Sequence, residues 1–161
     1  TPGPFYIRIN RGFDRVLYKD ADYGFEVGKA VEVHEGSDIT IIACGSCVFQ
    51  AFQAAEFLEK ADGLKVRVLD MHTIKPLDKE AVLKAVMDTR RIITVEDHTV
   101  IGGLGAAVCE CLAEKCPVPV LRVGINDEFG RSGPAKELVS YYHLDGASIA
   151  EKAKAAVALK K

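Results

Sequence analysis

Ile92-Ile93-Thr94-Val95-Glu96-Asp97-His98, followed shortly by Gly102-Gly103-Leu104-Gly105, is the stretch that decides the fold of this chain. Its first four residues form a short β-branched run, which predicts a buried parallel strand. Apolar residues then recur at helical spacing and predict an amphipathic helix that packs on the sheet: Leu104, Ala107, Val108, Cys111 and Leu112. In open α/β sheets, ligands and partners gather outside the carboxyl ends of the strands. The candidate residues for a crevice or an interface are therefore Glu96, Asp97, His98, Gly102 and Gly103.

The composition is that of a globular domain with a core of its own. The chain has 161 residues, of which 48% are hydrophobic and 27% are charged. Its net charge of −2 offers no electrostatic footprint for nucleic acid or for an anionic membrane. No apolar run approaches the roughly 20 residues that cross a bilayer. The five cysteines are an odd number without the spacing of a disulfide framework, which predicts a reducing cytoplasm.

Strands and helices alternate through most of the chain. The other predicted strands are Ala30–Val33, Thr40–Ala43, Lys65–Leu69 and Pro117–Val123. The other predicted helices run from Ser46 to just before Gly63, onward from Asp78 as N-cap, over Ala135–Tyr141 and over Ala147–Leu159. This alternation predicts βαβ units in an α/β fold. Only residues 35–38 separate the first of these strands from the second, too few for a parallel crossover. We therefore expect a hairpin there, and a mixed sheet with one antiparallel strand.

The first 24 residues differ from the rest of the chain. Phe5–Ile9 has the aromatic and β-branched composition of a strand, and residues 12–24 are an aperiodic mixture of the kind found in surface linkers. A lone strand followed by a linker cannot bury both of its faces. We therefore interpret residues 1–11 as the last strand of a missing preceding domain, 12–24 as a linker and 25–161 as one domain. The chain is then expected to be a fragment of something longer.

The cysteines suggest redox chemistry or metal binding, but packing explains them better. Cys44-Gly45-Ser46-Cys47 lies where a strand passes into a helix, and the positive end of a helix would favour a thiolate there. No active-site Trp or Pro surrounds this pair. Cys109 and Cys111 point to different faces of a helix and are poor metal partners for each other or for Cys116. We prefer the interpretation of small packing thiols, with no metal site.

Three further motifs also have simpler interpretations. Gly102–Gly105 opens a helix after a strand, where phosphates often bind, but the third glycine of a dinucleotide fingerprint is replaced by Val108. The acidic residues before it would also repel phosphate, so close approach of helix and sheet is the preferred role.

His98 beside Glu96 and Asp97 has the composition of a general acid or base. The sequence names no nucleophile to accompany it, and a structural or interface role is favoured. Likewise, residues 129–133 are read as a turn rather than an anion nest.

Three ordered motifs resemble one known family. They are Val68-Leu69-Asp70-Met71-His72-Thr73-Ile74-Lys75-Pro76-Leu77-Asp78, then Thr94–His98 with its glycine cluster, then Arg131-Ser132-Gly133. Together they resemble the carboxy-terminal domain of transketolase, and the similarity runs from about Phe5 to the end. Deoxyxylulose phosphate synthase and the β-subunits of 2-oxoacid dehydrogenases share the domain and remain alternatives. A freestanding binding or regulatory module using the Glu96–Gly105 crevice is the alternative from another class.

The resemblance implies a three-layer α/β/α domain with a five-stranded mixed sheet that has one antiparallel strand. It implies a parent enzyme that transfers a two-carbon ketol unit between sugar phosphates, in the pentose phosphate pathway, with thiamine diphosphate and a divalent metal, Mg²⁺ or Ca²⁺. The family builds that cofactor site from other domains, and its diphosphate-binding motif is absent from this sequence. We therefore expect no catalytic, cofactor or metal residue here. The expected partners are the missing amino-terminal domains or subunit and a second copy in a dimer.

One substrate-binding residue carries over from the family. In Arg8-Ile9-Asn10-Arg11-Gly12, the resemblance matches Arg11 to an arginine that binds the phosphate of the sugar acceptor. A rigid guanidinium fork suits a phosphate dianion in a way that lysine does not. Arg8 lies three residues earlier and would face the opposite side of an extended strand.

Overall fold

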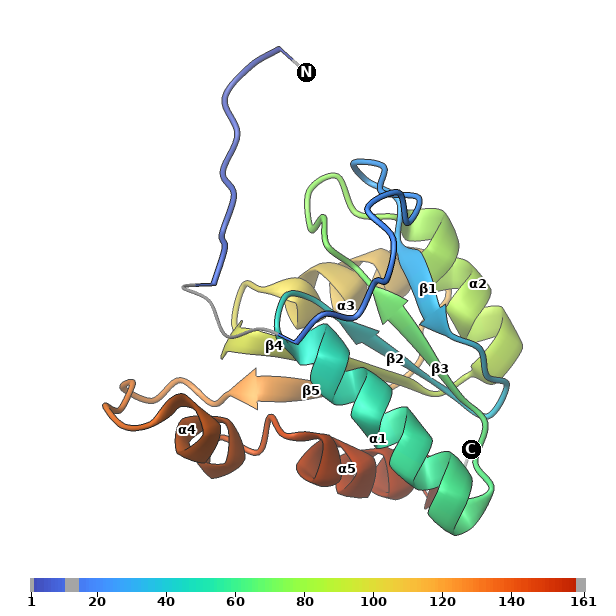
Figure 1. The fold of residues 1–161 in the computed structure, drawn as a ribbon. Helices are drawn as coiled ribbons and strands as arrows, with labels where there is room; N and C mark the ends of the chain where they lie inside the picture. The colour runs from blue at the N-terminus through green and yellow to red at the C-terminus, as the bar shows by residue number, and fades with distance from the viewer. Residues whose placement is uncertain (1, 11–14, 159–161) are drawn as a thin grey trace.

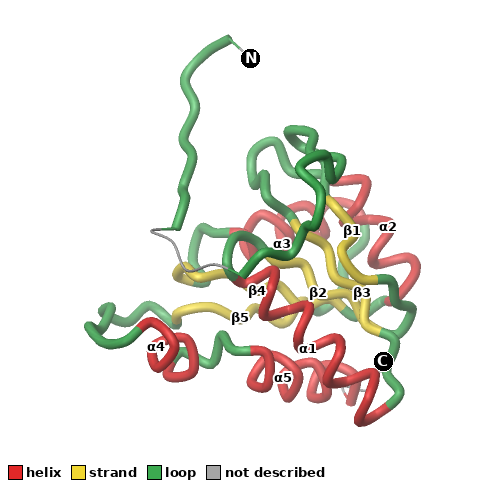
Figure 2. The backbone as a smooth tube through the Cα atoms, viewed as in Figure 1, coloured by secondary structure: helices red, strands yellow, loops and turns green. Residues whose placement is uncertain are grey.

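A computed structural model describes residues 2–10 and 15–158 of the chain. Five strands form one sheet in the order β1-β3-β2-β4-β5 (Figures 1 and 2). The strands are β1 (Val31–His34), β2 (Ile39–Ala43), β3 (Val66–Asp70), β4 (Ile92–Thr99) and β5 (Val120–Ile125). Strands β3, β2, β4 and β5 are parallel to one another, and β1 is antiparallel to β3. The prediction of a five-stranded mixed sheet with one antiparallel strand is therefore confirmed.

The predicted hairpin between the first two strands is wrong. Although only a short loop joins them, β1 pairs with β3 and β3 lies between β1 and β2. The loop passes against the beginning of β3, where a methyl group on Gly36 would collide with the backbone of Val66 and Arg67. The amides of Ser37 and Asp38 both donate to the carbonyl of Lys65. These contacts hold the loop across the end of β3, which a propensity argument based on loop length does not reveal.

Helices cover both faces of the sheet and complete the three layers (Figure 1). They are α1 (Cys47–Asp62), α2 (Lys79–Thr89), α3 (Leu104–Lys115), α4 (Ala135–Tyr141) and α5 (Gly146–Ala158). One buried cluster joins α1 and α5 to the sheet, and a second joins α2 and α3 to its opposite face. All five residues of β2 are buried because this strand is central and covered on both sides. The strand predicted at Thr40–Ala43 is confirmed.

The helix starts show which capping predictions hold. Asp78 caps α2 as predicted, because its carboxylate accepts a hydrogen bond of 3.0 Å from the amide of Ala81. Ser46 precedes α1 but its hydroxyl makes no capping hydrogen bond. Gly63 ends α1 in the left-handed conformation, at the predicted boundary. No helix among the described residues is long and apolar enough to span a membrane.

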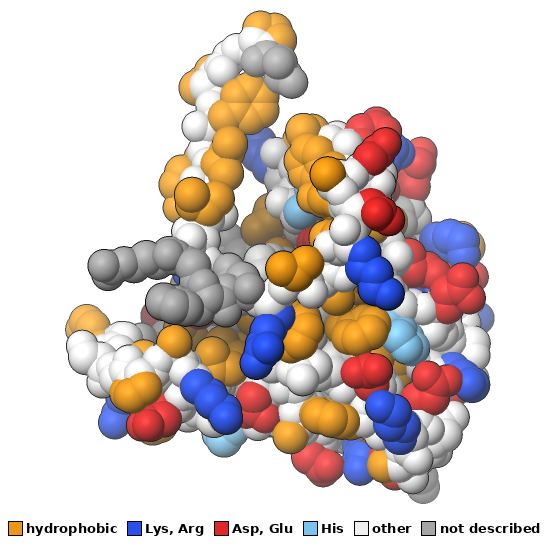
Figure 3. Space-filling view, in the orientation of Figure 1, with side chains coloured by type: hydrophobic (Ala, Val, Ile, Leu, Met, Phe, Trp, Pro, Cys, Tyr) orange, Lys and Arg blue, Asp and Glu red, His pale blue; other side chains and the backbone are white. Residues whose placement is uncertain are grey.

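Residues 2–10 extend away from the domain and belong to no strand of its sheet (Figure 1). Their apolar side chains are exposed, from 56% for Phe5 to 88% for Tyr6. Figure 3 shows these side chains along the projecting segment. The strand predicted at Phe5–Ile9 therefore has no partner strand among the described residues of this chain. Its assignment to a preceding domain stays a prediction.

Candidate functional site

The parallel strands end at one edge of the sheet, and the functional candidates gather there. Cys44 follows β2, Asp70 ends β3, and Glu96 lies near the end of β4. Strand β4 runs four residues beyond the predicted β-branched run, through Glu96, Asp97 and His98 to Thr99. The triplet Glu96-Asp97-His98 nevertheless has three different surroundings, one for each residue.

Glu96 is a structural anion at the start of α3. The residue is 1% exposed, and its two carboxylate oxygens accept hydrogen bonds of 2.7 Å from the amide of Leu104 and 2.8 Å from that of Gly105. A methyl group on Gly103 would collide with the same carboxylate, so glycine is required by the close approach. The helix end where a phosphate would bind is thus filled by a side chain of the protein itself.

The preferred role of the glycine cluster is supported by these contacts. A methyl group on Gly105 would lie 2.8 Å from the hydroxyl of Thr94 in β4 and 2.9 Å from the side chain of Arg122 in β5. The glycines therefore let α3 approach the sheet closely. Gly102 has a φ of 73°, a left-handed conformation that glycine adopts without strain.

The His98 ring is not paired with a carboxylate that would orient it as a general acid or base. Its Nδ1 is 2.9 Å from the carbonyl oxygen of Thr99, to which it donates, and 4.0 Å from the Glu96 carboxylate. Glu96 is already engaged by two backbone amides. The structural or interface role that the sequence favoured for His98 stays a prediction.

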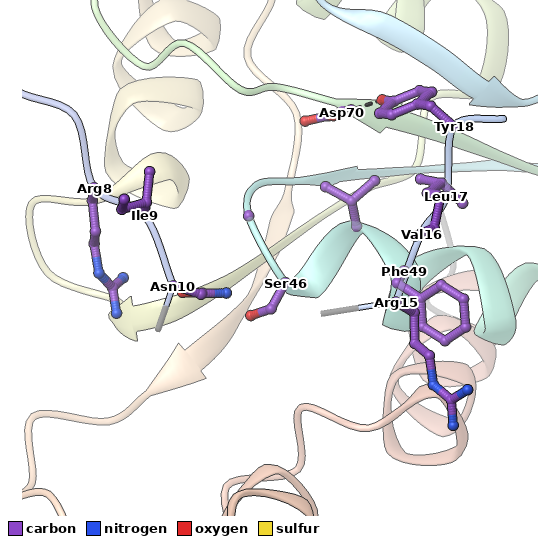
Figure 4. A pocket seen from close by; sticks show the side chains of 12 residues that line it. Arg8, Ile9, Asn10, Arg15, Val16, Leu17, Tyr18, Ser46, Phe49 and Asp70 are labelled. Atoms are coloured by element: carbon purple, nitrogen blue, oxygen red, sulfur yellow. Dashed lines mark hydrogen bonds between the residues drawn. The ribbon is translucent and has the colours of Figure 1, made fainter. Parts of the chain in front are cut away.

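Asp97 contacts the segment that precedes the domain. Its backbone carbonyl accepts a 2.6 Å hydrogen bond from Nη1 of Arg8, and its carboxylate lies 3.7 Å from Nη2 of the same side chain. Arg8, Ile9 and Asn10 also line one side of a cavity of about 490 Å³ at this edge. The amino end of α1 and residues 15–18 line the remainder, with Asp70 beside Tyr18 (Figure 4). Arg11, the predicted phosphate ligand, lies outside the described residues.

The predicted linker makes contacts that sequence reasoning missed. The Tyr18 hydroxyl donates a 2.6 Å hydrogen bond to Asp70, shown dashed in Figure 4. Tyr18 stacks on Tyr23 with ring centroids 3.9 Å apart, and the row of rings continues through Phe25 to His72. Burial raises the pKa of the Asp70 carboxyl above its ordinary value, although the Tyr18 hydrogen bond partly opposes this shift. The aromatic content of residues 18–25 was the available signal for this docking.

The two cysteines at the start of α1 do not form a thiolate site. Burial, followed by the charges of Glu96 and Asp70, raises the pKa of Cys44 to about 12. Burial also raises the pKa of Cys47, whose side chain lies in the core. Both remain protonated thiols near neutral pH, because burial, with a smaller contribution from nearby acidic groups, disfavours the thiolate. The redox alternative is therefore not supported.

Metal binding finds no support in the part of the chain that is described. Residues 2–10 and 15–158 contain no cluster of three His, Cys, Asp or Glu side chains arranged to hold an ion.

Near α4, the guanidinium of Arg131 lies over the ring of Tyr141, 4.4 Å from its centroid. This stacking occupies the arginine of the Arg131–Gly133 motif.

The comparisons with known proteins identify the family. Residues 28–149 match the family model described as transketolase, C-terminal domain. The chain belongs to the transketolase C-terminal domain family. The resemblance noted in the sequence is therefore confirmed, and the observed three-layer fold agrees with it.

Relatives of this transketolase C-terminal domain include separate subunits. A putative transketolase C-terminal section from Methanocaldococcus jannaschii is 45% identical over 93% of the chain, which covers 47% of that relative. One of the subunits of an apulose-4-phosphate transketolase from Phocaeicola vulgatus is also 45% identical, over 94% of the chain and 48% of its own length. The chain thus spans about half the length of the curated relatives it matches. A 1-deoxy-D-xylulose-5-phosphate synthase from Heliobacterium modesticaldum is less similar, at 36% identity.

A solved structure agrees with these relatives. The split gene transketolase described as an inactive beta4 tetramer superposes with a TM-score of 0.86 at 38% identity. The match covers 92% of this chain and 48% of that one. The similarity therefore extends over almost the whole domain.

The start of α3 does not fit the diphosphate of thiamine diphosphate, the cofactor that the family implies. The glycine-led helix start at α3 is closed by Glu96, whose negative charge would repel a diphosphate. The described part of the chain also lacks a metal-binding cluster to hold the accompanying cation. We therefore assign no catalytic step to the cofactor within this domain.

Proposed function

We propose that this chain is the carboxy-terminal part of a transketolase, which transfers a two-carbon ketol unit between sugar phosphates. The observation that carries the proposal is the 45% identity to a transketolase C-terminal section and to a transketolase subunit over nearly the whole chain. The lower identity of the synthase relative makes the related synthase the weaker alternative. The domain acts as scaffold and supplies contacts to other parts of the enzyme.

The required partner is the amino-terminal half of the enzyme, as preceding domains or as a separate subunit. The exposed apolar side chains of Phe5, Tyr6, Ile7 and Ile9 support this assignment. An extended segment with unpaired backbone groups is a template for pairing with the edge of another sheet. Residues 1–11 are then the last strand of the preceding domain and residues 12–24 the linker. The complete enzyme is a homodimer or a larger oligomer, and works in the pentose phosphate pathway of the cytoplasm.

The amino-terminal half holds thiamine diphosphate and its divalent metal, Mg²⁺ or Ca²⁺. When bound there, the cofactor supplies the carbanion chemistry of ketol transfer. Arg11 binds the phosphate group of the acceptor sugar, through the bidentate geometry that guanidinium groups offer to phosphates. No residue of the described domain takes part in the chemical step.

A binding experiment tests the division of labour. Titration calorimetry with Mg²⁺ present is expected to detect no saturable thiamine diphosphate binding to this chain, and clear binding once the amino-terminal partner is added. The reason is that the α3 helix end is filled by Glu96. Micromolar binding to the chain alone would contradict the proposal.

A further inference from the structure

The connection between β3 and α2, residues 70–78, receives the part of the chain that leads into β1. Four contacts join the two segments, and their order is the same along both. They pair Tyr18 with Asp70, Phe25 with His72, Gly28 with Pro76 and Ala30 with Asp78. The two segments therefore lie alongside each other in one register. We call residues 17–30 the strap; its first part, residues 17–24, belongs to the predicted linker.

The first contacts of the strap are a hydrogen bond and a ring contact. The Tyr18 hydroxyl donates a 2.6 Å hydrogen bond to the carboxylate of Asp70, a residue that is 7% exposed. Figure 4 shows the Tyr18 side chain turned toward Asp70. The Phe25 ring lies 4.4 Å from that of His72, measured between the two centroids. Hydrogen bonds to carboxylates and ring contacts are directional, so they fix the strap at one place.

Asp78 makes the last contact and joins the strap to α2. One oxygen of its buried carboxylate accepts the cap hydrogen bond from Ala81, and the other accepts a 2.9 Å hydrogen bond from the amide of Ala30. Ala30 directly precedes β1. A methyl group on Gly28 would lie 3.0 Å from Cγ of Pro76, and the φ of Gly28 is 83°, so glycine suits this close approach. One carboxylate thus fixes both the start of α2 and the entry into β1.

The strap crosses the carboxyl edge of the sheet from one face to the other. Leu17 packs against the buried cluster of α1 and α5, and Ala30 packs against that of α2 and α3. Between them, Tyr18 reaches Asp70 at the end of β3, and Asp70 lies opposite Val31 of β1. Strand β1 has four residues and lies at the edge of the sheet, where it pairs with β3. So short an edge strand forms few ladder hydrogen bonds, and its attachment depends on the strap at its entry.

The docked strap also has a cost, which makes it the part of the domain that is most easily released. Oδ1 of Asp70 and Nε2 of His72 are buried and find no hydrogen-bond partner among the described residues. Water would satisfy both atoms if the strap moved away. Most residues of the strap are exposed, including Phe25 at 54%. Segments held by few buried contacts open locally before a domain unfolds as a whole.

We propose that the strap holds the edge strand β1 on the sheet, and that strap and β1 release together as one unit while β2, β3, β4 and β5 stay folded. Release opens the carboxyl end of β3, where Asp70 and His72 lie, to solvent. The unit consists of described residues of this chain alone. The proposal is therefore independent of the proposed function, and its tests need neither the cofactor nor the amino-terminal partner.

Hydrogen exchange of this chain, followed by NMR for each amide, tests the proposal with Tyr18→Phe and Phe25→Ala. Tyr18→Phe keeps the ring but loses the hydrogen bond to a carboxylate, and should speed exchange of the β1 amides about 10-fold. Phe25→Ala should speed the exchange of the same amides. The other edge strand, β5, is the internal control, and its amides should keep their exchange rates. Phe129→Ala is the matched control variant, because it changes an aromatic residue that is 97% exposed.

Trypsin gives a second readout, because the exposed Lys19 lies between the two anchoring residues Tyr18 and Phe25. Cleavage after Lys19 tracks the population of the released strap, so in each variant its rate should rise by the same factor as β1 exchange. Three results would overturn the proposal. They are unchanged rates in both variants, faster cleavage after Lys19 without faster β1 exchange, and equal increases of exchange in β1 and β5.

Discussion

Glu96 and Gly103 are a matched pair, and their contact explains why an acidic residue is buried next to a glycine cluster. The carboxylate replaces the phosphate that a helix start of this kind otherwise binds, and the absent side chain at Gly103 leaves room for it. The charge at the end of β4 is therefore part of the fold of the domain. The same contact gives a sharp test at the level of single residues.

We expect Gly103→Ala and Glu96→Ala each to lower the free energy of unfolding by about 2–4 kcal/mol, through collision or through loss of two charge-assisted hydrogen bonds. Urea unfolding followed by circular dichroism measures this change. Gly130→Ala is the control, because a methyl group at Gly130 meets no atom within 4 Å. Equal stability of Gly103→Ala and Gly130→Ala would contradict the contact.

Asp70 makes a prediction about pH. Its pKa is raised in the folded state by burial, so its contribution to stability is present below the unfolded value of 3.8 and is lost as pH rises through the folded value. Asp70→Asn removes this titration and retains an acceptor for Tyr18. The advantage of Asp70→Asn over the wild type should therefore grow as pH rises from 4 to 7. Unfolding measured at several pH values tests this, and a constant difference would refute it.

At the scale of elements, periodicity located every strand and helix of the described domain within a few residues. Ala135–Tyr141 was predicted with its observed bounds, and the Asp78 cap holds because a local side chain determines it. The position of β1 was not predictable in the same way. Its partner is chosen by contacts of Gly36 and Asp38 with the beginning of β3, which are distant in sequence.

The site was predicted in part for the same reason. Glu96 and the glycine cluster lie together because a strand end and the next helix start are neighbours in the chain. The Tyr18–Asp70 bond and the Arg8–Asp97 contact, in contrast, join residues 52 and 89 positions apart. No spacing rule connects such pairs. The aromatic residues of the linker were a visible signal for docking, yet their target on β3 depends on the folded sheet.

The start of α1 yields a prediction about its thiols. All five cysteines are free in the structure, and burial raises the pKa of both Cys44 and Cys47. Thiol titration of the denatured protein without reductant should therefore count all five. In the native protein at pH 8, Cys44 and Cys47 should react slowly compared with the denatured chain. A stable disulfide between them would revive the redox alternative.

At the scale of the whole molecule, the domain is complete in its layers but presents an unpaired apolar segment at one edge. Both faces of the sheet are covered by helices, while Phe5, Tyr6, Ile7 and Ile9 remain exposed. These features support the proposal that the domain folds around its own core and joins a larger enzyme through residues 2–10. The contact of Arg8 with Asp97 lies where that junction meets the carboxyl edge.

The most direct measurement is ketol transfer between sugar phosphates by this chain with and without its amino-terminal partner, in the presence of thiamine diphosphate and Mg²⁺. No transfer is expected from either part alone, and turnover is expected when the two are combined. Ketol transfer by this chain alone, or a stable and cofactor-loaded assembly of both parts without transfer, would contradict it.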